Sequence, residues 1–321
     1  MRRAPPSASE ADAFAILEAV RRAALAVLSA ALALAAPAAA HASYPWPLKP
    51  FNRPHAIRGY FNDPRRDFVG DEIASSFHFG VDISAPDGTS IYAVAGGTVS
   101  RHFDYVTVTT PGGRDFGYWH IVPEVQQGQF VGEGAFLGRI QRGWGHVHFA
   151  ESMNGVYLNP LRPGALAPYY DTISPTVAAV TITRGGKPVD ATRVSGVVDL
   201  TCDAFDIPPL APPAPWQDTR VTPVLLRWRI EREDGGPATK WKTAIDFRFA
   251  LLPNSLFNLV YAPGTRPNRA GRPGRYVFYL KAGWSSAKLA NGEYRLRVGA
   301  WDTRGNSAFG ALPFTIANAK R

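Results

Sequence analysis

The chain has 321 residues, 45% of them hydrophobic and 19% charged, and this balance excludes a generally disordered protein. Its 28 prolines and 30 glycines favour short strands and turns over long helices, so we expect an all-β fold. The single cysteine, Cys202, excludes an intrachain disulfide and any cysteine-based zinc or redox site, while the net charge of +9 suggests contact with a polyanion.

Residues 1–42 have the pattern of a secretory signal peptide. Arg21 and Arg22 precede an apolar run over 23–36, and small residues follow as far as Ala42. We expect cleavage after Ala42, with Ala40 as the second choice, and therefore export to the periplasm, cell wall or exterior. A retained membrane anchor is the alternative, although the run is shorter than the roughly 20 apolar residues that span a bilayer. The long, mixed stretch before it is also consistent with translation starting near Val20.

After an extended segment at 43–57, residues 58–163 are expected to form a first β domain. Short apolar runs separated by glycines predict its strands, at 91–94, 97–101, 106–109, 116–121 and 145–151. The Pro-Gly-Gly sequence at 111–113 predicts a turn, so the strands on either side of it should form a hairpin.

His78, His120, His146 and His148 lie in this domain beside strand signals and glycines. In His146-Val147-His148 the two imidazoles would leave the same face of a strand. In His78-Phe-Gly-Val-Asp82 a histidine and a carboxylate lie four residues apart, with Gly80 permitting a sharp local backbone. Two imidazoles and one carboxylate suit zinc, and three protein ligands would leave a fourth position for water, as in catalytic sites.

These motifs, taken with Tyr118-Trp-His120, the Gly88–Val99 stretch and the glycines of 128–138, resemble the lysostaphin-like zinc endopeptidases of peptidase family M23 in both order and spacing. The resemblance covers about residues 58–160. It implies that His78, Asp82 and His148 bind one Zn²⁺ per chain and that His120 and His146 are the catalytic pair, with His146 favoured as the base. It also implies that the substrates are peptidoglycan peptides.

The sequence departs from the family pattern around these motifs. Trp119 is bulky where a small residue is common, and Trp144, Val147 and Ala150 replace typical neighbours of the H-x-H motif. Such changes affect the wall of the groove rather than the metal set, so they bear on substrate preference. Asn62 and Arg65 fall where the family has a substrate-side loop and are not assigned a catalytic role.

Residues 164–175 read as a Pro-rich linker, and 176–321 as an immunoglobulin-like β-sandwich without the usual cysteine pair. Alternating residues predict its strands, at 176–183, 197–200, 224–230, 276–280 and 294–300. Residues 171–321 carry the whole +9, which suggests contact with anionic wall polymers or lipid head groups rather than nucleic acid; a generic arginine-rich surface is the alternative. In Asp302-Thr-Arg-Gly-Asn306 the polar residues are expected to form a turn.

The sequence therefore predicts a secreted zinc metalloendopeptidase that hydrolyses peptide bonds of peptidoglycan cross-links or stem peptides. A catalytically silent protein of the same fold, which binds the wall or activates an amidase, is the alternative, although none of the five site positions is lost. A lipoyl- or biotin-type carrier is excluded because no lysine lies between Lys49 and Lys187. His55 and His102 match no motif and are expected to be structural.

Overall fold

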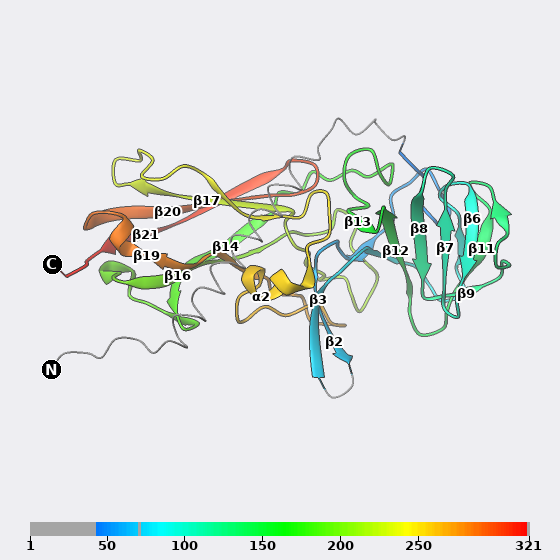
Figure 1. Cartoon of the computed structure of the whole chain (residues 1–321), viewed down its shortest axis with the longest axis horizontal. Coiled ribbons are helices and arrows are strands. Elements are labelled where there is room, and N and C mark those ends of the chain that lie inside the picture. Colours follow the sequence, from blue (N-terminus) through cyan, green and yellow to red (C-terminus); the bar gives the residue numbers. More distant parts are fainter. Residues whose placement is uncertain (1–42, 70–71, 320–321) are drawn as a thin grey trace. The chain divides into compact units, whose positions relative to one another are not determined.

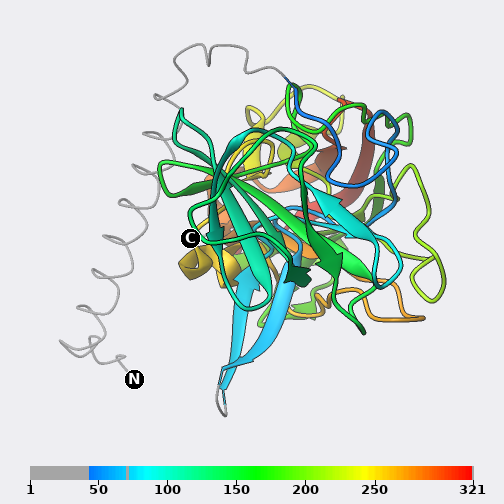
Figure 2. The same ribbon diagram turned by 90° about the vertical axis from the view of Figure 1, so that its right-hand side faces the viewer.

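The computed structural model describes residues 43–69 and 72–319, and Ser43–Arg321 forms one compact unit (Figures 1 and 2). The all-β prediction is confirmed, because the regular elements of the described chain are strands apart from one short helix, α2 (Phe257–Val260), and three 3₁₀ turns. The signal peptide predicted at 1–42 lies outside the described residues. Within the described ranges no helix is long and apolar enough to cross a membrane.

The first half of the unit is built on an eight-stranded antiparallel sheet with the order β1-β4-β12-β8-β7-β6-β10, and β13 pairs with β12. Its strands are β1 (Ile57–Gly59), β4 (Val81–Ser84), β6 (Gly97–Arg101), β7 (Tyr105–Thr109), β8 (Arg114–Trp119), β10 (Phe130–Val131), β12 (His146–Met153) and β13 (Val156–Leu158). A three-stranded sheet has the order β5-β11-β9, and β2 and β3 form a hairpin. These strands are β2 (Pro64–Val69), β3 (Glu72–Phe77), β5 (Ser90–Tyr92), β9 (Ile121–Pro123) and β11 (Phe136–Ile140).

The period-two pattern of the sequence explains how this sheet buries one face. Along β7 the side chains alternate between half-buried and buried, and Val106 and Val108 enter the core. The hairpin expected across 111–113 is present, because β7 pairs with β8 in antiparallel register. The segment after Ser43 packs into the same core through Tyr44, Trp46 and Leu48.

The second half consists of two four-stranded antiparallel sheets, with the orders β15-β14-β16-β19 and β18-β17-β20-β21. Their strands are β14 (Thr176–Arg184), β15 (Lys187–Pro188), β16 (Val197–Phe205), β17 (Leu225–Arg232), β18 (Lys242–Asp246), β19 (Val277–Ser285), β20 (Gly292–Trp301) and β21 (Ser307–Ile316). Side chains from both sheets form a second hydrophobic core, in which Trp228 and Cys202 are fully buried.

The two cores exchange residues, so the halves are not independent bodies. Phe77, at the end of β3, is buried in the second core, and Val221, from the second half, is buried in the first. The Asp302–Asn306 turn also reaches across: Arg304 donates hydrogen bonds to the carbonyls of Tyr169 and Leu161. The domain boundaries expected at 58–163 and 176–321 remain a prediction.

Candidate metal centre

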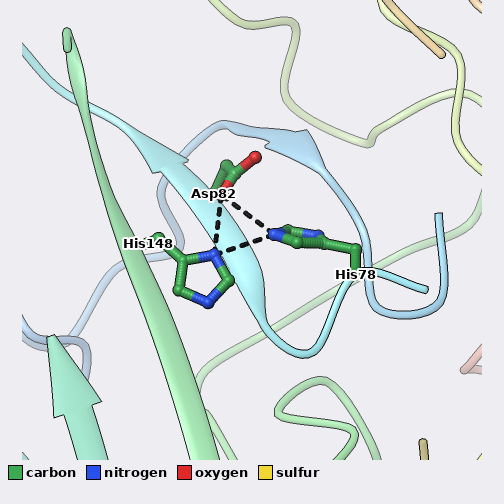
Figure 3. Close-up of side chains that lie close together, drawn as sticks. All are labelled: His78, Asp82 and His148. Atoms are coloured by element: carbon green, nitrogen blue, oxygen red, sulfur yellow. Dashed lines mark hydrogen bonds and ion pairs between the residues drawn. The ribbon is translucent and has the colours of Figure 1, made fainter. Parts of the chain in front are cut away.

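Three side chains converge where β4 lies beside β12. Asp82 on β4 is the direct cross-strand partner of His148 on β12, so their side chains leave the same face of the sheet. His78 precedes β4 and reaches the same point, as Figure 3 shows. Nε2 of His78 and Nδ1 of His148 each lie 3.1 Å from Oδ1 of Asp82, and the two nitrogens are 2.8 Å apart. All three residues are buried.

The ring orientations fit a zinc ion at this point. Nδ1 of His78 lies 2.8 Å from the carbonyl oxygen of Tyr60. A carbonyl oxygen can only accept, so Nδ1 carries the hydrogen and Nε2 keeps its lone pair toward Asp82 and His148. Nitrogen and oxygen atoms whose lone pairs face one another are a donor set for Zn²⁺. Nε2 of His148, on the far side of its ring, is buried and has no partner among the described residues.

A second ion pair holds Asp82 in place. Nη2 of Arg65 donates a 2.6 Å hydrogen bond to Oδ2, which leaves Oδ1 for the metal position. Burial would raise the pKa of Asp82, but its interactions with His78 and with the Arg65 cation outweigh this effect and hold the pKa well below its usual range. Asp82 is therefore an anion at neutral pH. Arg65, expected on a substrate-side loop, lies on β2 and lines the same cleft as the metal group.

Gly80 lies at a bend of the backbone, as expected, and it also allows a close contact. A β-carbon at this position would lie 2.3 Å from the carbonyl oxygen of Phe149 and 2.8 Å from Nε2 of His148. The residue therefore allows the His78–Asp82 segment to approach β12 closely, and its φ is not in the left-handed region.

His146 and His120 lie beside the metal group. His146 leaves β12 on the same side as His148, and its Nε2 is 3.5 Å from Oδ1 of Asp82. The ring centroids of His120 and His146 are 4.8 Å apart. His120 has a φ of 66°, a left-handed conformation that is uncommon outside glycine and that often marks functional sites. All five predicted site residues thus gather in one place.

The environment keeps the imidazoles of His78, His120 and His148 neutral. Burial lowers the pKa of His148 to about 4 and the pKa of His120 to about 3, and it also lowers the pKa of His78. Neutral imidazole is the form that ligates a metal and accepts a proton. Nδ1 of His120 is buried without a partner in the described part of the chain, and the ring stacks on Trp144 at 3.5 Å.

A cleft of about 420 Å³ opens over these residues. Trp119 and Trp144, the departures from the family pattern, form part of its wall. The other wall was not found from the sequence: it includes Arg58 on β1 and, from the second half of the chain, Trp216 and Asn268. No motif connects Trp216 or Asn268 to the histidines, because only the tertiary fold brings them together.

The second half also supports His78. Asn62 donates its backbone N–H to the carbonyl of His78, and the N–H of His78 donates to the carbonyl of Asp63. The side chains of Asn62 and Asp63 are anchored on the second half of the chain. Oδ1 of Asp63 accepts from the N–H and the hydroxyl of Thr222, and Oδ1 of Asn62 accepts from the N–H of Leu252. Tyr261 donates its hydroxyl to the carbonyl of Asn62. Asn62 is thus a buried residue that links His78 to the second half of the chain, rather than a substrate-side residue.

The remaining polar motifs have structural contacts. Nε2 of His55 lies 3.1 Å from the carbonyl of Pro50, and His102 stacks on Tyr105. In the predicted turn, Oδ1 of Asp302 accepts from the N–H groups of Arg304 and Asn306. Asp302 also belongs to a cluster of three buried carboxylates with Asp171 and Asp206.

Comparison with known proteins gives one family. The sequence model of peptidase family M23 matches residues 76–160, which span His78, Asp82, His120, His146 and His148. Residues 76–160 form an M23 peptidase domain. None of the curated proteins matches the chain.

Solved structures show weaker likenesses to the chain. Helicobacter pylori Csd3 is 23% identical over 38% of this chain and 34% of its own, with a TM-score of 0.30. A zinc-containing peptidase from Vibrio cholerae is 23% identical over 35% and 37%, with a TM-score of 0.28. The catalytic domain of lysostaphin from Staphylococcus simulans is 20% identical over 32% and 87%, with a TM-score of 0.27. The chain spans about a third of the length of the first two proteins, and likenesses this small carry no argument about activity.

Proposed function

We propose that the chain is an exported zinc metalloendopeptidase that hydrolyses peptide bonds of peptidoglycan cross-links or stem peptides. The observation that carries this proposal is the convergence of His78, Asp82 and His148 in an M23 domain, with His120 and His146 beside them. The proposed metal is one Zn²⁺ per chain. Export is proposed from the signal-like sequence at 1–42.

A zinc ion held by these residues would supply Lewis acidity, which polarises a peptide carbonyl and lowers the pKa of water. The chain's own residues complete the chemistry. His146 lies outside the metal group with its Nε2 3.5 Å from Oδ1 of Asp82, and we assign it the role of proton acceptor from water. His120 faces the same cleft and, as a hydrogen-bond donor, would stabilise the oxygen anion that develops on the substrate carbonyl.

We further propose that the second half is an immunoglobulin-like sandwich. Its first, second and fifth long strands (β14, β16, β19) share one sheet, and β17, β18, β20 and β21 share the other, which is the strand distribution of that architecture. The buried Trp228 lies on β17, the third long strand, where immunoglobulin domains have a core tryptophan. Its basic residues are proposed to contact anionic wall polymers.

The direct experiment is digestion of purified peptidoglycan by the zinc-loaded protein, with products identified by mass spectrometry. New amino and carboxyl termini within the peptides are the expected result. Retention of zinc without any cleavage of walls or muropeptides would contradict the proposal and would favour the catalytically silent alternative.

A further inference from the structure

Arg58 is a cation in the cleft without a carboxylate partner. Its Nη2 atom lies 2.8 Å from the carbonyl oxygen of Trp144 and 2.5 Å from Nδ1 of His146, and neither of these neighbours is a carboxylate. No carboxylate whose side chain the structure describes lies within ion-pair distance of this guanidinium. The cleft's second arginine, Arg65, differs because Asp82 neutralises it at 2.6 Å.

The guanidinium of Arg58 is partly desolvated, and some of its N–H donors lack a partner among the described residues. The Arg58 side chain is half-buried, and burial lowers its pKa, which the charges of Asp82 and Asp87, neither within ion-pair distance, offset only in part. A guanidinium offers five N–H donors in a planar fork, and Nε and Nη1 have no hydrogen-bond partner among the described residues. A partly desolvated guanidinium with free donors is a receptor for a carboxylate, which it can bind in a bidentate manner.

Trp216 fixes the plane of this receptor. The Arg58 Cζ atom lies 4.6 Å from the centroid of the Trp216 ring, within the range of a cation–π contact. Trp216 is itself held, because its carbonyl accepts from the N–H of Thr219 and its N–H donates to the carbonyl of Pro213. The N–H of Gly271, on the loop that also carries Asn268, donates to the carbonyl of Pro215 and so ties the two loops together.

We propose that Arg58, held against Trp216, is a specificity subsite that binds a free carboxylate of the substrate peptide. Peptides with a free carboxylate close to the scissile bond would then be preferred over the same peptides with that group amidated. The inference rests on the proposed peptidase function, since it names the chemistry of the peptide which that cleft accepts. It also assigns the second half of the chain a part in substrate selection.

The test compares two synthetic stem peptides that differ only in whether the carboxylate beside the scissile bond is free or amidated. We expect the native protein to prefer the free acid by about 10- to 100-fold in kcat/KM, the value of a hydrogen bond to a charged group. Arg58→Met should remove this preference by slowing the acid peptide alone. Arg58→Lys, which keeps the charge but loses the planar fork, should retain part of it. Arg101→Met, an exposed arginine on β6, is the matched control and should leave the preference unchanged.

Two outcomes would overturn the inference: a native protein that cuts both peptides equally well, or an Arg58→Met protein that slows both peptides by the same factor. The second would mean that Arg58 only positions His146. Zinc content and melting temperature of each variant show whether it is folded and loaded. If the native protein cut neither peptide, the proposed function would fail, and tryptophan fluorescence titration with the same two peptides would still decide whether Arg58 selects the free acid.

Discussion

The metal group and the cleft wall that contains Trp216 and Asn268 are built in different ways. His78, Asp82 and His148 sit on or beside two paired strands of one sheet, so their geometry follows from the hydrogen-bond register of β4 and β12. Trp216 and Asn268 lie on loops of the second half and reach the cleft only through tertiary packing. The comparison indicates that the proposed metal site is local to the M23 domain, whereas the support of His78 and the proposed carboxylate subsite also involve the rest of the chain.

The strongest test of the local side of this comparison is removal of the two histidines that do not belong to the metal group. His120→Ala and His146→Ala should each lower kcat by about 10²- to 10⁴-fold, the contribution of a positioned acid or base. Both variants should retain zinc, because neither ring belongs to the group formed by His78, Asp82 and His148. Steady-state kinetics with metal analysis checks this, and loss of zinc together with activity would place the changed residue among the ligands.

Truncation after residue 170 tests whether the second half of the chain only tethers the enzyme to the wall or also supports the metal site. If the second half only anchors the enzyme on the wall, the shortened protein should cut small soluble peptides at the native rate. We instead expect a loss of at least about 100-fold, because Asn62 and Asp63, which hold His78, would lose their anchors on Leu252 and Thr222, and small displacements at an active site are costly. Phe77 would also lose the core in which it is buried. Native rates on soluble peptides would refute the supporting role.

Thr222→Val probes a single contact of that support. The substitution keeps the backbone N–H bond to Asp63 and removes the 2.9 Å hydroxyl bond to the same buried carboxylate oxygen. We expect a loss of about 1–3 kcal/mol in unfolding free energy, the cost of a buried polar group left short of a partner. Chemical denaturation measures it, with Thr98→Val, on the exposed face of β6, as the control. Equal effects of both changes would show that Asp63 does not depend on Thr222.

The buried carboxylate cluster predicts a smaller, pH-dependent effect. Burial raises the pKa of Asp206 to about 8 and the pKa of Asp171 to about 6. The folded state therefore holds more protons than the unfolded state between about pH 4 and pH 8, and stability should fall as the pH rises through this window. Asp206→Asn should weaken this decline, so its melting temperature relative to the native protein should improve from pH 5 to pH 8. Parallel pH profiles of the two proteins would contradict it.

Much of the site could be predicted because its signals are short-range. A strand places His146 and His148 on one side. The short stretch from His78 to Asp82 brings both of these side chains to one point. The strands over 97–101 and 176–183 were found because their residues alternate or are β-branched. The structure brings all five predicted site residues together in one cleft.

Other features could not be found from the sequence for physical reasons. β4 has only four residues, all of them buried, so it shows no alternation, and β21 contains Gly310 and Pro313, which read as turn signals. The roles of Arg58 and Trp216 depend on a contact across more than 150 residues of chain. Long-range contacts of this kind leave no spacing pattern, so only the folded structure reveals them.

The most direct test of the account is the zinc content and hydrolytic rate of His148→Ala beside the native protein. We expect about one zinc per native chain and little or no zinc in the variant, since loss of one of three ligands leaves only His78 and Asp82. Hydrolysis of muropeptides should fall to background at the same time. A variant without zinc that still cuts muropeptides at the native rate would contradict the central claim.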